Sequence, residues 1–431
     1  MDLLADLEAR GLVHDSTDRA ALAARLAPGQ PPITLYYGCD PTADSLHHGN
    51  LIGLVTLRRF QDAGHTAIAL AGGATGMVGD PSGRSDERNL LDDATLDRNV
   101  AAIKEQLGRI VDVSGARGRL VDNRDWTQPL TLLQFLREVG RHATVNQMLA
   151  RESVRIRLES EQGISYTEFT YMLLQANDYL WLHDNLGCEL QIGGSDQWGN
   201  IISGVDLVRR TRHVAVHALS WPLLTAADGS KLGKSTGARL WLDPAKTSPY
   251  QFHQHWLQLD DAEVAGQFKM FSLRPLADIE AVLAEHARAP ERRLAQRALA
   301  DDVTTIVHGE EAARAAAEAG ELLFGGDPFG ASAAALETVA AEVPSSRLAG
   351  GELGDPVELL VTTELASSKS DARRLLQQGS VRANGLVVRP DQGLDPASLL
   401  HGRFLLLRKG KRSYHLAEIL GAEVDAPGGG R

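Results

Sequence analysis

The sequence contains little cysteine and no long hydrophobic run. Only two of its 431 residues are cysteines, Cys39 and Cys188, which are too few for a disulfide framework and too far apart for zinc-type spacing. No run of about 18 apolar residues occurs, so no membrane-spanning helix is expected. The N-terminal MDLLADLEARGL is acidic and helix-like, unlike a signal peptide. We therefore expect a cytoplasmic protein without a membrane partner.

The overall composition is that of a globular protein. Apolar residues make up 43% of the chain and charged residues 23%, which excludes a mainly disordered or fibrous protein. At about 150 residues per domain, the length predicts two to four domains, of which at least one buries a sizeable core.

The charge of the chain is unevenly distributed. The net formal charge of −12 by itself argues against a nucleic-acid partner. Residues 366–412, however, contain ten basic and three acidic residues, a net charge of +7, so the remainder carries −19. An acidic body with one small basic module predicts a localised site for a polyanion.

The hydrophobic pattern of the N-terminal half predicts a parallel α/β fold. Residues 33–37 and 66–71 are typical of short buried strands, and the amphipathic stretch 51–63 between them is typical of a helix. A further apolar run, 189–192, leads into two glycines. The simplest interpretation is a domain with a parallel sheet that extends to about residue 240.

The C-terminal half has a different pattern. Residues 249–323 are helical in pattern, and residues 324–355 are rich in Gly, Ala, Ser and Pro, which is typical of a linker, with one short helix at 333–342. The basic module that follows predicts a helix at 369–378, a turn at Asn384-Gly385, and strands at 386–388 and 404–407. The predicted divisions are a sheet domain 1–245, a helical domain 246–323, a linker 324–355, a small α+β domain 356–420 and a disordered tail 421–431.

Two loops of the predicted sheet domain are suited to a phosphate. In residues 36–50 a strand ends in a polar loop and a helix begins; backbone N–H groups and the helix dipole favour an anion there, and His47 adds a donor. An ordinary capped turn is the alternative. Residues 71–84 contain five glycines that permit close approach to a ligand, with Arg84 and Arg88 nearby. A purely structural loop is equally compatible with this second pattern.

Polar residues in two further segments are candidates for binding a small ligand. Tyr171, Gln175 and Asp178 fall on one face of an otherwise apolar helix. Buried polar groups need partners, which are either other side chains or a ligand. Asp196 and Gln197 follow the run 189–192, at the sheet edge where parallel sheets bind ligands, although a structural loop is the alternative.

A fifth segment, DGSKLGKS at residues 228–235, contains a pair of lysines. The chain has 8 lysines and 36 arginines, yet Lys231 and Lys234 fall within four residues. A lysine ammonium is a compact charge suited to phosphate oxygens during transfer. Two solvated loop lysines are the alternative.

Taken in this order, the five segments resemble the bacterial-type tyrosyl-tRNA synthetases of class I. The H-H-G-N of residues 47–50 is similar to the class signature H-I-G-H, and the K-L-G-K-S of residues 231–235 is similar to its partner K-M-S-K-S. The resemblance covers nearly the whole chain. It implies a Rossmann-like catalytic domain, a helical domain and a small α+β RNA-binding domain. It also implies an ATP-dependent ligase that forms tyrosyl-adenylate, releases pyrophosphate and transfers tyrosine to the 3′ end of tRNA(Tyr).

The resemblance further implies roles for individual residues. Substrate tyrosine is expected to contact Tyr36, Asp80, Tyr171, Gln175, Asp178 and Gln197. ATP binding is expected of Asp40, Gly49, Gly194, Asp196 and Lys234, and catalysis of Thr42, His47, Asn50, Arg84, Arg88, Lys231 and Lys234. RNA binding is expected of Lys369, Arg373, Arg374 and Arg382.

Two positions depart from the family pattern. Asn50 stands where the signature has its last histidine, and Arg84 stands where the family often has lysine. The resemblance also implies ATP as a substrate with Mg²⁺, no tightly bound protein-liganded metal, and a homodimer, for which a helix at 130–149 and the segment around Tyr166 are the candidate interface.

Two other functions compete with this interpretation. One is a related synthetase for another amino acid, tryptophan being nearest; Asp178 on the same face as Tyr171 and Gln175 favours a phenol. The other is an RNA-binding or RNA-splicing protein that has lost catalysis. The presence of Lys231, Lys234, His47 and Asp80 argues against that second alternative.

Overall fold

The computed structural model describes residues 2–82, 91–159, 163–223 and 239–420. The chain forms two compact units. Unit 1 comprises Met1–Thr247 and Gln258–Leu299, and unit 2 comprises Ser248–Leu257 and Ala300–Arg431.

Unit 1 is built on a five-stranded parallel sheet. Its strands lie in the order β3-β2-β1-β4-β5, which confirms the predicted parallel α/β fold. Their bounds are β1 (Thr34–Cys39), β2 (Thr66–Ala71), β3 (Gly118–Asp122), β4 (Cys188–Gly194) and β5 (His217–Trp221). In β2 every residue after the first is buried, as expected of a strand covered on both faces.

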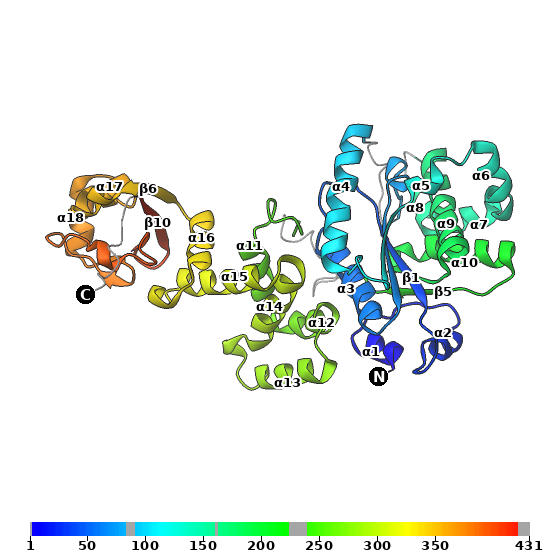
Figure 1. Cartoon of the computed structure of the whole chain (residues 1–431), viewed down its shortest axis with the longest axis horizontal. Coiled ribbons are helices and arrows are strands. Elements are labelled where there is room, and N and C mark those ends of the chain that lie inside the picture. The colour runs from blue at the N-terminus through cyan, green and yellow to red at the C-terminus, as the bar shows by residue number, and fades with distance from the viewer. Residues whose placement is uncertain (1, 83–90, 160–162, 224–238, 421–431) are drawn as a thin grey trace, which may run out of the picture. The chain divides into compact units, whose positions relative to one another are not determined.

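Helices cover both faces of this sheet (Figure 1). The helices α3 (His48–Asp62) and α4 (Asp93–Ile110) lie on one side, and α9 (Tyr166–Leu186) and α10 (Trp198–Arg212) on the other. The packing of α9 on α10 needs a small residue, because a Cβ at Gly204 would lie 3.0 Å from the Cβ of Tyr179. The shorter helices are α1 (Leu3–Ala9), α2 (Arg19–Leu26), α5 (Arg124–Thr127), α6 (Leu132–Glu138), α7 (Val145–Leu149), α8 (Glu152–Leu158), α12 (Asp261–Phe271) and α13 (Leu276–His286).

The strand order of the sheet opens a crevice in which a ligand can bind. The chain moves outward from β1 to β2 and β3 and then returns to add β4 on the other side of β1. The loops that follow β1 and β4 therefore leave the sheet in opposite directions, and a crevice opens at the carboxyl ends of these two strands.

The predicted helix at 130–149 is wrong as a continuous element. The structure contains α6 and α7, separated by a 3₁₀ turn over Gly140–His142. Thr144 interrupts the helical pattern, because its side chain accepts a hydrogen bond from the backbone N–H of Gln147 and so caps a new helix.

Unit 2 combines helices with a second five-stranded sheet. Its strands lie in the order β6-β10-β9-β7-β8. The hairpin between β7 and β8 turns at Asn384 and Gly385, whose φ angles are 46° and 81°, as the predicted turn requires. The elements are α11 (Pro249–Leu257), α15 (Glu310–Leu323), α16 (Ala333–Glu342), β6 (Ser345–Ala349), α17 (Pro356–Thr362), α18 (Lys369–Gln377), β7 (Val381–Ala383), β8 (Leu386–Val387), β9 (Phe404–Lys409) and β10 (Ser413–Leu420).

The interpretation of 324–355 as a linker is wrong. The helix α16 packs into a core with α15 and the sheet, through residues such as Leu336, Val339 and Leu416. After it, β6 pairs in parallel with β10, with Leu348 opposite Ile419. The small residues that suggested flexibility instead allow close helix packing, and β6 becomes a strand only because β10 supplies its hydrogen bonds.

The compact units also divide the predicted helical domain 246–323. The helices α12 and α13 belong to unit 1, whereas α11 and α15 belong to unit 2, and α14 (Leu294–His308) runs from one unit into the other. The predicted tail, 421–431, lies outside the described residues.

Candidate active site

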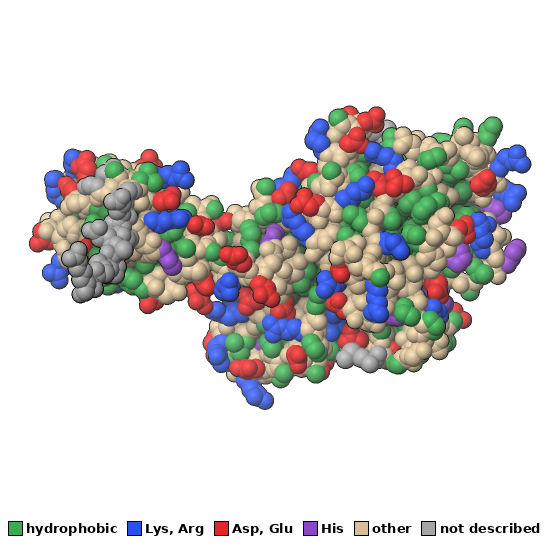
Figure 2. Space-filling model, in the orientation of Figure 1, with side chains coloured by type: hydrophobic (Ala, Val, Ile, Leu, Met, Phe, Trp, Pro, Cys, Tyr) green, Lys and Arg blue, Asp and Glu red, His purple; other side chains and the backbone are tan. Residues whose placement is uncertain are grey.

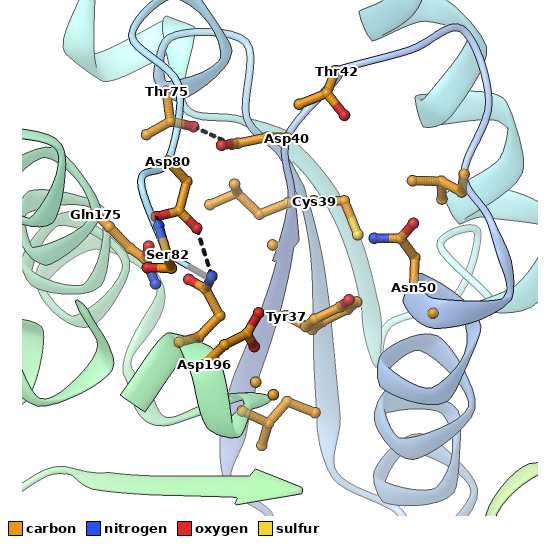
Figure 3. Close-up of a pocket in the computed structure, with 18 of the residues that line it drawn as sticks. Tyr37, Cys39, Asp40, Thr42, Asn50, Thr75, Asp80, Ser82, Gln175 and Asp196 are labelled. Carbon is orange, nitrogen blue, oxygen red and sulfur yellow. Dashed lines mark hydrogen bonds between the residues drawn. The ribbon is translucent and has the colours of Figure 1, made fainter. Parts of the chain in front are cut away.

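A cavity of about 340 Å³ lies at the carboxyl ends of β1 and β4. It brings together side chains from β1, the start of α3, the loop after β2, helix α9 and the loop after β4 (Figure 3). Among its lining residues are thirteen that the sequence analysis selected: Tyr36, Asp40, Thr42, His47, Gly49, Asn50, Asp80, Tyr171, Gln175, Asp178, Gly194, Asp196 and Gln197. Arg84, Arg88, Lys231 and Lys234 lie outside the described residues.

One end of the cavity holds a buried carboxyl group and an unpaired phenol. Asp178 is only 2% exposed, and its two carboxylate oxygens accept hydrogen bonds from Trp126 Nε1 at 2.8 Å and Asn123 Nδ2 at 3.0 Å. Burial raises the pKa of Asp178 to about 7, against the opposing effect of these two donors. The hydroxyl of Tyr36 is buried and has no hydrogen-bond partner among the described residues. An arrangement of this kind fits a ligand hydroxyl, which both donates and accepts.

The sequence did not identify Asn123 and Trp126 as candidate site residues. Asn123 is the N-cap of α5, Trp126 lies within this short helix after β3, and no motif marks either residue. The indole of Trp126 also stacks on Trp181 of α9, with ring centroids 4.2 Å apart, which fixes its N–H toward Asp178. Only their proximity to Asp178 in the folded chain identifies them.

The second group of carboxylates lies next to Tyr171. Asp40 accepts hydrogen bonds from the Tyr171 hydroxyl and from Thr75 Oγ1, both at 2.7 Å. Asp80 accepts from Gln197 Nε2 at 2.5 Å and from Asn200 Nδ2 at 3.2 Å. Two oriented carboxylates beside a phenol form a suitable environment for a ligand ammonium group.

A hydrogen-bonded chain connects these two ends of the cavity. Asn123 Nδ2 lies 2.9 Å from Thr75 Oγ1 as well as 3.0 Å from Asp178, and Thr75 in turn donates to Asp40. The side chains at both ends are therefore oriented by the same network before a ligand binds, which reduces the cost of reorganisation.

The start of α3 provides neutral hydrogen-bond donors. His47 is the N-cap of this helix, and its Nδ1 accepts from the backbone N–H of Gly49 at 3.0 Å. The remaining ring proton therefore lies on Nε2. Burial, together with His48 and Arg239, lowers the pKa of His47 to about 4, so the ring is neutral at physiological pH. The side chain of Asn50 completes a capping box by accepting from the backbone N–H of His47 at 3.1 Å.

Arg239 adds a positive charge that the sequence analysis missed. It lines the same cavity, and its guanidinium lies 5.5 Å from the centre of the Trp241 ring. The sequence feature that could have identified Arg239 as a candidate is its position just after the glycine-containing segment 228–235.

The four residues expected to bind RNA are basic side chains that are exposed in unit 2. Lys369, Arg373 and Arg374 lie on α18, and Arg382 lies on β7. Lys369 and Arg374 form surface ion pairs with Glu358 and Asp371. Such exposed pairs are weak and leave both cations available to an anionic partner.

Neither a metal-binding cluster nor a membrane-spanning helix occurs in the described part of the chain. Within those ranges, no group of three or more His, Cys, Asp or Glu side chains is placed to hold a metal ion. Among the same residues, no helix has the length and apolar character needed to cross a membrane.

Comparisons with known proteins agree with the geometry. The family model for tRNA synthetases class I (W and Y) matches residues 28–325, and that for the tyrosine–tRNA ligase SYY-like C-terminal domain matches residues 335–417. A tyrosine–tRNA ligase of Opitutus terrae is 50% identical over 97% of this chain and 100% of its own length. One from Bacillus caldotenax is 49% identical over 96% of this chain and 99% of its own.

Solved structures show the same relationship. The crystal structure of a C-terminally truncated mitochondrial tyrosyl-tRNA synthetase of Aspergillus nidulans is similar, with a TM-score of 0.67 and 31% sequence identity. The similarity covers 75% of this chain and 94% of that one. The chain therefore belongs to the class I tRNA synthetases of the tryptophan and tyrosine type.

Proposed function

We propose that the chain is a tyrosine–tRNA ligase, which activates L-tyrosine with ATP and transfers it to tRNA(Tyr). The observation that carries the choice of amino acid is that Asp178 lines the same cavity as the Tyr36 hydroxyl, which has no hydrogen-bond partner among the described residues. A phenol can donate to Asp178 and accept from Tyr36, so that every group is paired. An indole N–H can only donate and would leave the Tyr36 hydroxyl proton without an acceptor in a buried site.

The rest of the cavity is suited to the other groups of the amino acid. Asp80, Tyr171 and Gln175 hold the α-ammonium group, and Gln197 lies beside the carboxylate in this proposal. The hydrogen bonds of Asp80 and Tyr171 support it, because they hold both side chains in fixed orientations. Binding at both ends positions the carboxylate for attack, which contributes to catalysis without any covalent step by the protein.

ATP lies along the β1–α3 side of the cavity in this proposal. One tyrosine carboxylate oxygen attacks the α-phosphorus of ATP, and the bond to the bridging oxygen breaks, so that pyrophosphate leaves with the electron pair. Asp40, Thr42, Gly49, Gly194 and Asp196 contact the nucleotide. The Nε2–H of His47 and the amide of Asn50 donate to phosphate oxygens, and the N-terminus of α3 adds its dipole.

Cations complete the proposed charge stabilisation. ATP enters as its Mg²⁺ complex, in which phosphate oxygens hold the ion. We assign Arg84, Arg88, Lys231 and Lys234 to the pyrophosphate leaving group on the family resemblance, and Arg239 on its place in the cavity wall. A cytoplasmic location completes the proposal.

The direct test is exchange of pyrophosphate into ATP with each of the twenty amino acids in turn. Exchange is expected with tyrosine alone. Exchange with tryptophan instead would assign the chain to the other amino acid of this family, and no exchange with any amino acid would favour the RNA-binding protein without catalysis.

Tyrosine binding is expected to depend on pH near neutrality. The ionised Asp178 can accept a third hydrogen bond from the substrate, whereas the protonated acid cannot do so equally well. Since the pKa of Asp178 is about 7, the Kd for tyrosine should rise as pH falls from 8 to 6, at most about tenfold per pH unit. His47, with a pKa of about 4, stays neutral over that range. Equilibrium dialysis checks this; phenylalanine is the control, and an equal pH dependence for both amino acids would contradict the assignment.

The basic residues of unit 2 are proposed to bind tRNA. Simultaneous substitution of Lys369, Arg373, Arg374 and Arg382 by Gln should lower kcat/KM for tRNA charging at least about tenfold, because these cations no longer neutralise phosphates. The slope of log affinity against log salt should fall by about one for each phosphate that is no longer neutralised. Pyrophosphate exchange is the internal control and should not change. Normal charging and an unchanged salt slope would place the tRNA-binding surface elsewhere.

We also propose a homodimer formed through the outer helices of the sheet domain. Leu132, Leu133 and Leu136 of α6, and Tyr166 at the start of α9, are exposed, Leu133 by 72% and Tyr166 by 71%. Figure 2 shows hydrophobic side chains over this end of the sheet domain. An exposed apolar face of this kind is typical of a protein interface.

Leu133→Asp is expected to convert the dimer to a monomer, because it places a charge in the apolar interface. Sedimentation velocity at several concentrations measures the change. Phe324→Asp in unit 2, where Phe324 is 79% exposed, is the matched control and should leave the dimer intact. A monomeric wild type, or a dimeric Leu133→Asp variant, would show that this face is not the interface.

A further inference from the structure

Residues 239–242 lie directly against the start of α3. His47 and Trp241 form an antiparallel bridge, and the backbone N–H of His48 donates to the Leu240 carbonyl at 3.0 Å. In such a bridge the two opposite side chains leave the backbone on the same side. The indole of Trp241 accordingly packs edge to face with the His47 ring, with ring centroids 6.3 Å apart. Both side chains line the cavity.

Further contacts fix the position of Trp241. Its backbone N–H donates to Thr247 Oγ1 at 3.1 Å. The Lys246 ammonium lies 5.3 Å from the centre of its ring, and this lysine is itself held by an ion pair with Asp44 at 2.6 Å. An indole whose backbone is hydrogen-bonded and whose ring is packed offers an aromatic face of defined orientation.

Arg239 is a second cation at the same ring. Its guanidinium carbon lies 5.5 Å from the ring centre, within the range of a cation–π interaction. The exposed side chain of Arg239 lines the cavity, whereas Lys246 is not part of the cavity wall. Among the described residues no carboxylate forms an ion pair with Arg239, whereas Lys246 has Asp44. Of the two cations, only Arg239 is therefore placed to meet a ligand in the cavity.

The chemical nature of its partner determines how much of the arginine charge a ligand can use. A long exposed side chain samples many rotamers, so a partner that holds it reduces the entropy lost when a ligand binds. A carboxylate would hold the guanidinium but would also neutralise it and compete with an anionic ligand. The face of an indole attracts a cation through its quadrupole and has no net charge. Arg239 is therefore held with its full positive charge available.

We propose that Trp241 is a positioning residue for Arg239, which it holds by its ring face so that the guanidinium is directed at the phosphates of ATP. The proposal rests on the proposed function, which assigns Arg239 to the leaving pyrophosphate, and it specifies what orients this cation. The bridge also places His47, the proposed donor to a phosphate oxygen, opposite the indole. One short backbone pairing thus brings a neutral donor and an oriented cation to the same end of the cavity.

A double-mutant cycle on the full chain tests the proposal. Pyrophosphate exchange is measured at saturating tyrosine and varied ATP for the wild type, Arg239→Met, Trp241→Leu and the double variant. Arg239→Met should lower kcat/KM for ATP at least about tenfold. Trp241→Leu should lower it about 2- to 5-fold, because the cation is present but no longer oriented. In the Arg239→Met background, Trp241→Leu should have almost no effect, because its target is gone.

Lys246→Met is the matched control. It removes a cation from the same ring at a position outside the cavity wall, so kcat/KM for ATP should not change. Trp241→Phe is the conservative variant, because it keeps an aromatic face and should retain most of the activity. Should Trp241→Leu fail to fold, Trp241→Phe takes its place in the cycle, and its smaller effect must likewise vanish in the Arg239→Met background.

A second measurement requires neither ATP nor activity. The side-chain protons of Arg239 should resonate upfield of their usual position in the wild type, because they lie over the face of the Trp241 ring. Their NMR signals are identified by their absence from the spectrum of Arg239→Met. The upfield shift should disappear in Trp241→Leu and persist in Lys246→Met.

The outcomes are distinguishable. A fully active Trp241→Leu variant, or an effect of Trp241→Leu that is equally large with and without Arg239, would overturn the positioning role while leaving the ligase function intact. Arg239 protons at their usual resonance position in the wild type would overturn it as well. Absence of tyrosine-dependent exchange in the wild type would contradict the proposed function instead, and the NMR measurement would still decide whether Trp241 holds Arg239.

Discussion

Asp178→Asn is expected to lower kcat/KM for tyrosine activation by roughly 100- to several-thousand-fold, corresponding to about 3 to 5 kcal/mol. Two effects add up. The substrate hydroxyl is deprived of a charged acceptor, and the asparagine amide presents only one oxygen to two fixed donors, Trp126 Nε1 at 2.8 Å and Asn123 Nδ2 at 3.0 Å. One of these buried donors is then left facing an N–H₂ group, which costs free energy whether or not substrate is bound.

The measurement compares adenylation of tyrosine and phenylalanine by the wild type, Tyr36→Phe and Asp178→Asn. Phenylalanine serves as the control because it has no hydroxyl. Tyr36→Phe should reduce the tyrosine preference only in part, by about 1 kcal/mol, since Asp178 remains. Thermal unfolding of each variant distinguishes the removal of one hydrogen bond from a general destabilisation of the fold. An unchanged ratio of the two kcat/KM values in both variants would show that the hydroxyl is recognised elsewhere.

His47→Ala is expected to lower kcat for adenylate formation about 100-fold, with little change in the KM for tyrosine. The Nε2–H of His47 is proposed to donate to a phosphate oxygen whose negative charge grows in the transition state. The ring is neutral at the pH of the assay, with a pKa of about 4, so the effect belongs to a hydrogen bond and not to a positive charge. The rate in the wild type should therefore show no titration of His47 between pH 6 and 8.

His47→Asn is the matched variant for this prediction. His47 also caps α3 through its Nδ1, and asparagine is a good N-cap that still has an amide donor. His47→Asn should therefore retain more activity and more stability than His47→Ala. If both variants lose the same activity and the same stability, the cap alone explains the effect. If His47→Ala has a normal kcat, His47 is a structural residue.

Local sequence patterns predicted much of the fold and many of the residues of the proposed site. Two apolar runs with an amphipathic stretch between them predicted β1, α3 and β2. The prediction succeeded because the burial of each of these elements follows the pattern of apolar residues in its own sequence. The five motif segments predicted thirteen residues that the structure places around one cavity. This worked because the carboxyl ends of parallel strands meet at one sheet edge, so residues following different strands converge there.

Long-range contacts account for what the sequence did not predict. Asn123 and Trp126 acquire a role only because α5 is folded against the α9 residue Asp178, across 52 or more positions of the chain. In the same way, β6 is a strand only because β10 lies beside it, and its own composition indicated a flexible linker. The compact units separate α11 and residues 300–323 from α12 and α13, although the predicted helical domain 246–323 had grouped all of them together. Periodicity and turn chemistry act over a few residues, so the sequence by itself predicts the elements that depend on them. The pairing of distant segments depends on how their shapes fit and on which buried polar groups find partners, so only the tertiary structure determines that pairing.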